Sequence, residues 1–220
     1  MSYPPDFQLL LASRSPRRRE LLAAAGIPFG QVVSCAQEEI TAGDPLLTVE
    51  LNARAKADGA LIPEGVSRPL FVLGADTVVV CDGMILGKPF DRDEARGMVR
   101  MLSGRRHTVV SGVALRREDA EAEGVAGSGV GETLVGCSQT YVWFQRLDGS
   151  QIEAYLNTGE WHDKAGAYGI QGRAGLLVER IEGEYFTVVG LPLGLLVSLF
   201  RRLGFDLIAR RWAGNPAGGV

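Results

Sequence analysis

Residues 70–81 read LFVLGADTVVVC, the most strand-like run in the chain. The pair Asp82-Gly83 follows at once and is a strong hairpin signal that leads into the segment MILGKP. Asp76 lies inside the apolar run, where a carboxylate is costly unless a partner or a metal ion takes its charge. It could be a structural hydrogen-bond acceptor or a site residue. We favour the site, because Thr77 and the hairpin keep several polar groups close to it.

Strand and helix patterns alternate on both sides of this run, without an internal repeat. Further strands are expected at residues 7–12, 28–34, 107–115 and 133–144, with two short strands within 176–189. Helices are expected at residues 16–25, 45–60, 92–102, 151–156 and 192–203. Ser15, Asp44 and Asp91 stand where caps would start three of these helices. The sequence thus predicts an α/β fold with a mixed, twisted sheet flanked by helices.

The composition is that of a globular protein: 46% of the 220 residues are hydrophobic and 22% are charged. That balance excludes disordered and collagen-like chains, and the length favours a single domain over residues 1–220. The net charge of −3, from 23 basic and 26 acidic residues, gives no general field that would attract a polyanion. We therefore expect no nucleic acid polymer as a partner, and any affinity for anions must be local.

The sequence predicts a cytoplasmic protein without membrane contact. Three widely spaced cysteines fit neither a disulfide framework nor a paired zinc site. The N-terminal apolar run is short and its basic residues follow it, the reverse of a secretory signal. No apolar stretch approaches the roughly 20 residues that span a bilayer. Residues 118–132 are rich in glycine and acidic residues, and we expect a flexible insertion there.

A first cluster of candidate site residues lies where the first strand feeds the first helix: Ser13, Ser15, Arg17 and Arg18. Free N–H groups and the positive end of the helix dipole favour an anion at such a place, and the guanidinium groups would extend the site. This pattern suits a phosphate. The alternative is that Ser15 is only a cap and the arginines form a solvated helix face, and the spacing alone does not decide between the two.

A second cluster is acidic. Glu38 and Glu39 follow a predicted strand and could converge with Asp76 on one cation, for which oxygen ligands suit Mg²⁺ or Mn²⁺. A glutamate pair by itself is usually surface. Lys88 does not belong to a P-loop, because its glycines are wrongly spaced and a proline follows it. Lys56 lies in a helix pattern where a solvent-facing lysine is the default.

A third cluster is the segment DKAGAYGIQG at residues 163–172. Its small residues allow a backbone to approach a ligand closely, and Gln171 could read a base edge with its donor and acceptor. A tight structural loop is the alternative. With only two histidines and no Ser-His-Asp order, a zinc site or a serine nucleophile is implausible. The remaining groups, carboxylates and cations, fit phosphoryl transfer to water.

Taken together, the motifs resemble one family, the Maf-like nucleoside triphosphate pyrophosphatases, also called septum-formation proteins. They are LLASRSPRRRELL, VLGADTVVVCDGMILGKP, MLSGRRHTVVSGV, DKAGAYGIQG and VVGLPL, in the family's order and over nearly the whole chain. The resemblance implies a Maf/ITPase-like fold with a cleft between two lobes. It also implies metal-dependent hydrolysis of a nucleoside triphosphate to the monophosphate and pyrophosphate, a cytoplasmic setting, and frequent homodimers.

The resemblance also implies roles for single residues. Asp76 is expected to be the proton acceptor, and Glu38 to help hold metal or water, although a one-residue slip would move that role to Glu39. The positions expected to contact the substrate are Ser13, Ser15, Arg17, Arg18, Lys56, Thr77, Lys88, Asp163 and Gln171.

The preferred base follows from three of these positions. In the branch of the family that this sequence resembles, Arg17, Thr77 and Gln171 go with dTTP and UTP. The branch that handles 7-methyl-GTP tends to carry an aromatic residue, Gln and Glu there, which suits a cationic base. The sequence therefore predicts pyrimidine nucleotides. Cleavage of 7-methyl-GTP or another modified nucleotide is the alternative, and a non-catalytic nucleotide-binding regulator of cell division is another.

Overall fold

The computed structural model describes residues 2–41, 43–119 and 131–213. Nine strands are found in these residues: β1 (Gln8–Leu11), β2 (Gly30–Gln31), β3 (Leu70–Cys81), β4 (Met84–Leu86), β5 (Arg106–Glu118), β6 (Thr133–Phe144), β7 (Val178–Glu182), β8 (Phe205–Asp206) and β9 (Arg211–Trp212). The helices are α1 (Pro16–Ala24), α2 (Pro45–Asp58), α3 (Arg92–Leu102), α4 (Gly149–Leu156), α5 (Tyr185–Val189) and α6 (Leu193–Arg202), with 3₁₀ turns η1 (Ala165–Ala167) and η2 (Arg173–Leu177).

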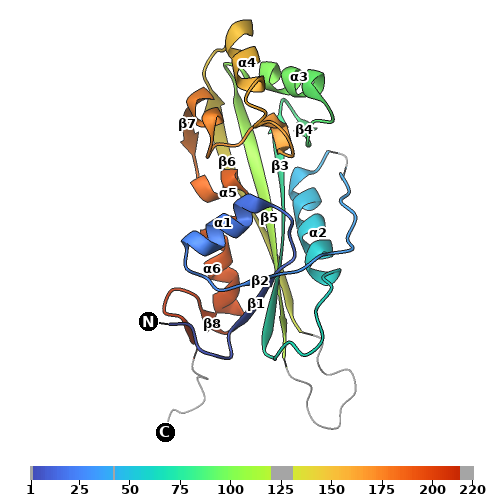
Figure 1. Ribbon diagram of the computed structural model, residues 1–220, viewed down its shortest axis with the longest axis vertical. Helices are drawn as coiled ribbons and strands as arrows, with labels where there is room; N and C mark the ends of the chain where they lie inside the picture. The colour runs from blue at the N-terminus through green and yellow to red at the C-terminus, as the bar shows by residue number, and fades with distance from the viewer. Residues whose placement is uncertain (1, 42, 120–130, 214–220) are drawn as a thin grey trace.

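Seven of the described strands form one sheet. Its order is β2-β1-β3-β5-β6-β7, and β4 pairs with β3 off this path. Strand β1 is parallel to β2 and β3, whereas β3, β5, β6 and β7 are antiparallel neighbours. The predicted α/β fold with a mixed sheet is confirmed. Figure 1 shows the long strands β3, β5 and β6 running through the length of the molecule between the helices.

The two faces of β3 bury different helices, because successive side chains of a strand point to opposite faces. Leu70 and Val72 pack in one apolar cluster with residues of α2. Phe71 and Leu73 belong to a second cluster with α1 and α6. Farther along the same face, Val79 belongs to a third cluster, which contains residues of α3 and α4. The face that carries α1 and α6 thus has two separate apolar clusters. Figure 1 shows α3 and α4, which contribute to the second, above α1 and α6, which contribute to the first.

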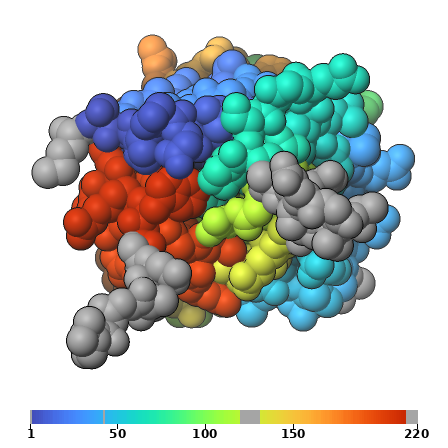
Figure 2. All heavy atoms as spheres, turned by 90° about the horizontal axis from the view of Figure 1, so that it is seen from below, coloured from blue at the N-terminus to red at the C-terminus, as the bar shows by residue number. Residues whose placement is uncertain are grey.

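At the lower end of the molecule, elements from both ends of the chain meet. Figure 2 looks at this end and shows the N-terminal residues in blue and the C-terminal elements in red beside the ends of β5 and β6. Phe7 and Phe205 lie 4.6 Å apart between ring centroids, and Phe71 and Phe200 lie 4.7 Å apart. This aromatic packing ties the residue before β1 to β8, and β3 to α6.

The strongest local signals in the sequence are confirmed. Strand β3 has the predicted bounds, and the turn at Asp82-Gly83 joins it to β4 with both residues at positive φ. The Asp44 side chain accepts a hydrogen bond from the Leu47 N–H and caps α2. The Asp91 side chain caps α3 in the same way.

Two local predictions were wrong, and a third, the cap at Ser15, was confirmed in position only. Residues 185–189, YFTVV, form α5 rather than a strand, although their β-branched and aromatic residues favour a strand. Gly190 at φ 115° ends that helix in a backbone conformation that favours glycine. The strand predicted at 28–34 covers only Gly30–Gln31. Ser15 is the N-cap residue of α1, but its side chain makes no capping hydrogen bond.

The predicted insertion at residues 118–132 lies mostly outside the described residues, which break off at 119 and resume at 131. None of the helices in the described residues combines the length and the apolar composition that a membrane span requires. The three cysteines are free, and they lie at an exposed, a buried and a half-buried position.

Candidate functional site

A cavity of about 1040 Å³ lies between the two apolar clusters on the α1 and α6 face of the sheet: Val189 from one cluster and Val79 from the other both line it. All of the predicted site residues line this cavity: Ser13, Ser15, Arg17, Arg18, Glu38, Lys56, Asp76, Thr77, Lys88, Asp163 and Gln171. The expected cleft between two lobes is therefore present. The roles of these residues stay predictions.

The cavity opens onto an unpaired stretch at one edge of β3. Strand β1 pairs with β3 only as far as Leu73, and β4 pairs with it only from Val79 onward. Within the described residues, no strand covers this edge at Asp76 and Thr77, while β5 pairs with them on the other side. The gap gives one cavity access to both faces of β3, so that the neighbouring side chains of Asp76 and Thr77 both reach it.

Helix α2 comes unusually close to the sheet beside this gap. A side chain at Gly74 would meet the Ala53 carbonyl oxygen at 2.1 Å, and one at Gly112 would meet the Val49 carbonyl oxygen at 2.4 Å. Only glycine permits that approach. The close packing brings the buried Lys56 of α2 against β3.

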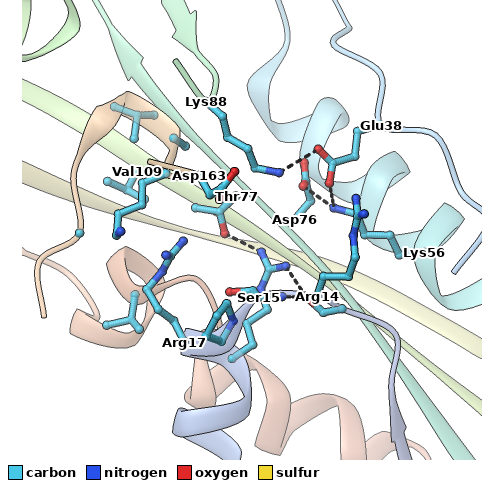
Figure 3. A pocket seen from close by; sticks show the side chains of 18 of the residues that line it. Arg14, Ser15, Arg17, Glu38, Lys56, Asp76, Thr77, Lys88, Val109 and Asp163 are labelled. Carbon is cyan, nitrogen blue, oxygen red and sulfur yellow. Dashed lines mark hydrogen bonds and ion pairs between the residues drawn. The ribbon is translucent and has the colours of Figure 1, made fainter. Parts of the chain in front are cut away.

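The Lys56 ammonium joins the two predicted acidic residues. Its Nζ lies 2.7 Å from Asp76 Oδ1 and 2.8 Å from Glu38 Oε1, and it also donates to the Ala75 carbonyl at 3.3 Å. Figure 3 shows these side chains converging with Lys88, whose ammonium lies 3.5 Å from Glu38 Oε2. Asp76 is 7% exposed. Its buried charge is compensated by Lys56, the kind of partner that the sequence analysis requires.

Glu38 is the glutamate that faces the cavity, and Glu39 does not line it. Partial burial raises the pKa of Glu38, but hydrogen bonds and charge from Lys56 and Lys88 outweigh burial and hold that pKa below its ordinary value. Glu38 is therefore ionised at neutral pH. The geometry favours Glu38 over the one-residue slip.

Asn52 of α2 is a partner of Asp76 that sequence reasoning missed. Its Nδ2 donates to Asp76 Oδ2 at 3.0 Å and to the Glu39 carbonyl at 2.8 Å, and its Oδ1 accepts the Glu39 N–H at 2.9 Å. A signal was present, because an asparagine inside a helix, one turn before Lys56 on the same face, is unfavourable unless its side chain has a partner. Arg14, Lys164 and Tyr168 also line the cavity and were not singled out.

Arg18 connects α1, β3 and the loop after α5. Its Nε donates to the Gly190 carbonyl at 2.8 Å, its Nη1 to Ser13 Oγ at 3.0 Å and its Nη2 to Thr77 Oγ1 at 3.1 Å. A guanidinium carries five N–H groups, so two of them are left for a ligand. The arginine is 8% exposed and is held in place before any substrate binds.

The Thr77 hydroxyl can only accept a hydrogen bond from a ligand. Ser111 Oγ donates its one hydrogen to the Thr187 carbonyl at 2.8 Å. In the 2.8 Å contact between Thr77 and Ser111, the Thr77 hydroxyl is therefore the donor and Ser111 Oγ the acceptor. Arg18 already donates to Thr77 Oγ1. What Thr77 offers the cavity is one remaining lone pair.

Arg17 lies next to Arg18 but is placed differently. Burial lowers its pKa, while the charges of Glu20 and Asp163 act in the opposite direction. In the described part of the chain, the Arg17 guanidinium makes no hydrogen bond or ion pair, and Figure 3 shows it extending into the cavity away from the Lys56 cluster. It is free to meet an anion.

The segment 163–171 forms the far wall of the cavity and is fixed from behind. The Tyr168 hydroxyl lies 2.8 Å from His107 Nε2, and the Tyr155 hydroxyl donates to the Ala167 carbonyl at 3.1 Å. A side chain at Gly166 would meet Val79 Cγ2 at 2.9 Å, so the turn lies directly on β3. Gln171 is exposed, and its side chain makes no hydrogen bond within the described residues.

The two carboxylates fit part of a magnesium or manganese site. Among the described residues, no group of three or more His, Cys, Asp or Glu side chains is arranged to hold a metal ion. Mg²⁺ is nonetheless commonly held by one or two carboxylates together with substrate phosphates. Glu38 and Asp76 both contact the Lys56 ammonium, so their two carboxylates lie close together. Both offer oxygen ligands only.

Comparison with known proteins decides the family. Residues 8–203 match the family model described as "Maf-like protein". The chain belongs to the Maf family.

Several curated Maf relatives are similar to this chain over almost its whole length. A protein of Symbiobacterium thermophilum is 46% identical over 91% of this chain and 96% of its own, and one of Moorella thermoacetica is 48% identical over 92% and 98%. One of Thermococcus gammatolerans is 45% identical over 92% of this chain and all of its own. Each is named "dTTP/UTP pyrophosphatase".

Proposed function

We propose that this Maf protein is a nucleoside triphosphate pyrophosphatase that hydrolyses dTTP and UTP to the monophosphate and pyrophosphate. The observation that carries the proposal is the cavity itself, where a buried, ion-paired Asp76 shares one space with Arg17, Arg18 and Lys88. Six cationic side chains and three carboxylates line that space, although the whole chain carries a net charge of −3. Such a local excess of positive charge suits a triphosphate.

Asp76 acts as the proton acceptor in this proposal. A water oxygen attacks the α-phosphorus, its proton passes to an Asp76 oxygen, and the bond to the oxygen that bridges the α- and β-phosphates breaks. The electron pair leaves with pyrophosphate. Lys56 and Asn52 both donate to Asp76, so each carboxylate oxygen acts as a hydrogen-bond acceptor.

The cations neutralise the phosphates and the departing pyrophosphate. Arg18 and Lys56 are already bound to protein groups and provide a preorganised positive field. Arg17 and Lys88 have room to move toward the substrate, because Arg17 has no fixed partner in the described residues and Lys88 makes only a 3.5 Å ion pair. Ser13 and Ser15 lie at the start of α1 beside these groups.

A divalent cation, Mg²⁺ or Mn²⁺, completes the proposal. Glu38 and Asp76 would hold it together with the substrate phosphates. When bound, it would withdraw electron density from the phosphate oxygens.

Preference for pyrimidines is supported by the names of the relatives and by two polar groups that line the cavity. Gln171 offers both a donor and an acceptor, and Thr77 offers an acceptor. Uracil and thymine present one N–H between two carbonyl oxygens, so the Gln171 amide can accept from the N–H and donate to one carbonyl, while the Thr77 acceptor finds no second donor on the base. Neither group is a carboxylate that would favour a cationic, methylated guanine.

One panel of substrates tests the function. Pyrophosphate release is measured from dTTP, UTP, CTP, GTP and 7-methyl-GTP, with Mg²⁺, with Mn²⁺ and with chelator. We expect release from dTTP and UTP above the others, and only with metal. Preference for 7-methyl-GTP would contradict the pyrimidine assignment, and binding without release from any nucleotide would favour a regulator.

The same proposal includes a homodimer, a cytoplasmic location and a single domain over residues 1–220. Size-exclusion chromatography with light scattering tests the dimer.

A further inference from the structure

The Asn52 carboxamide uses every polar atom it has. Its Oδ1 accepts the Glu39 N–H, one Nδ2 hydrogen goes to the Glu39 carbonyl and the other to Asp76 Oδ2. The side chain belongs to a residue that is 5% exposed, so water does not compete for these bonds. The amide thus bonds both the N–H and the carbonyl of Glu39, as the backbone of a neighbouring strand would.

This arrangement fixes the orientation of the amide. Exchange of Oδ1 and Nδ2 would set an oxygen against the Glu39 carbonyl and the Asp76 carboxylate, and a donor against the Glu39 N–H. All three bonds would be lost together. Asn52 therefore presents an N–H to Asp76 and cannot present an oxygen.

The two oxygens of Asp76 are thereby held by two different donors of one helix. Lys56 Nζ holds Oδ1 at 2.7 Å and Asn52 Nδ2 holds Oδ2 at 3.0 Å. Two donors on the two oxygens fix the plane of the carboxylate, whereas one donor would leave it free to rotate. The same asparagine ties down the backbone next to Glu38, the other carboxylate bound to Lys56.

We propose that Asn52 is a positioning residue for the reaction: it sets the plane of Asp76 and holds the Glu38 segment beside it. The inference rests on the proposed pyrophosphatase activity. Asn52 does not line the cavity, so it acts through Asp76 and Glu38 and not on the substrate. Its loss lowers the rate of the chemical step and leaves nucleotide binding intact.

Thr48 provides a matched control on the same helix. It lies one turn before Asn52, is fully buried, and holds the same segment through the Thr41 N–H, which donates to Thr48 Oγ1 at 3.0 Å. Its hydroxyl donates to the Asp44 carbonyl at 2.8 Å and contacts neither carboxylate. Loss of Thr48 thus disturbs the segment, and loss of Asn52 disturbs the segment and Asp76.

The experiment compares Asn52→Leu, Asn52→Ser and Thr48→Val with the wild-type protein. For each we measure kcat and KM for dTTP in pyrophosphate release, and the shift in melting temperature caused by a non-hydrolysable dTTP analogue. Asn52→Leu keeps the size and removes all three bonds, and Asn52→Ser is a polar variant in case the first does not fold. We expect kcat to fall about 10- to 150-fold in both Asn52 variants, as for lost hydrogen bonds to a charged group.

The expected KM and analogue-induced shift stay within about twofold of wild type in all variants, and Thr48→Val keeps its kcat. An equal fall of kcat in Thr48→Val and the Asn52 variants would reduce Asn52 to an anchor of the segment and overturn the inference. So would unchanged kcat in both Asn52 variants while the wild type is active. A wild-type protein that releases no pyrophosphate from any nucleotide would overturn the proposed function, and the inference with it.

Discussion

The two ends of the cavity differ in how far their polar groups are already used. At the carboxylate end, Asp76, Glu38 and Lys56 line the cavity with Asn52 behind them, and each of these side chains is bound to another part of the protein. At the loop end, formed by the segment 163–171 and the Arg17 side chain that faces it, Gln171 and Arg17 make no hydrogen bond within the described residues. One end is complete without a ligand, and the other is not.

This difference separates two tasks. A group that takes a proton must be held in one geometry, and fixed donors around Asp76 do so. A group that recognises a ligand must have unused hydrogen-bond donors or acceptors. At the loop end, Gln171 and Arg17 have them. The neighbours Arg18 and Arg17 repeat the contrast within one helix, since Arg18 is held by three hydrogen bonds and Arg17 by none in the described structure.

The largest effect is expected at the carboxylate end, from Asp76→Asn. The substitution keeps the shape and removes the proton acceptor, so kcat for pyrophosphate release should fall by about 10² to 10⁴, or roughly 3 to 5 kcal/mol in barrier. Binding should persist because the cations of the loop end remain. The melting shift with a dTTP analogue checks binding, and undiminished turnover would remove Asp76 from the mechanism.

An acid-dependent loss of stability is expected behind the loop end. Burial lowers the pKa of His107 from 6.5 to about 4. As pH falls from 6.5 to 4, the unfolded chain binds a proton at this histidine that the folded protein does not, so stability falls across that window by up to about 3 kcal/mol. Below pH 4 this residue adds no further loss.

The loss would loosen the loop end first, because His107 Nε2 contacts the Tyr168 hydroxyl. Free energies of urea unfolding at pH 7 and pH 4.5 measure it. The His107→Phe variant, in which the ring stays beside Phe144 and cannot titrate, should show a shallower dependence on pH. Identical slopes for the variant and the wild type would contradict this prediction.

A loss of binding is expected from Arg17→Ala. Removal of a free cation that faces the cavity should lower kcat/KM for dTTP by about 1.5 to 3 kcal/mol with little change in melting temperature. Arg19→Ala is the matched control, since Arg19 lies two residues farther along α1, reaches Gln31 instead, and does not line the cavity. Equal losses in the two variants would mean that only the general charge of α1 matters.

The smallest effect is expected from Gln171→Glu. A carboxylate there can only accept, so it should cost about 0.5 to 1.5 kcal/mol with UTP, one neutral hydrogen bond, and narrow the gap between UTP and 7-methyl-GTP. The ratio of kcat/KM for the two nucleotides measures this. A ratio equal to that of the wild type would show that Gln171 does not read the base.

The sequence predicts well those strands, turns and helix starts that depend only on residues close together in the chain. The apolar run and turn signal of residues 70–83 define β3 and its hairpin, and Asp44 and Asp91 mark helix starts through bonds to residues three positions away. The segment YFTVV was mispredicted because its composition favours a strand, and packing places it in a helix instead.

The sequence predicts less well the contacts that depend on distant residues. Asn52 and Asp76 are 24 positions apart, and nothing local shows that one donates to the other. The same holds for the chain of bonds from Arg18 through Thr77 and Ser111 to Thr187, which links four elements. The resemblance to the family predicted which residues share the cavity, and the structure adds which of them are held and by what.

Strand β3 also restricts how the cavity can open. At the gap, Asp76 and Thr77 stay paired with Gly112 and Ser111 of β5, and β5 with β6 beyond, in ladders that run unbroken past the site. A hinge through this back wall would have to break those ladders. We therefore expect the sheet to stay rigid during turnover. Any movement that admits a nucleotide or releases pyrophosphate is expected in the helices and turns in front of the sheet.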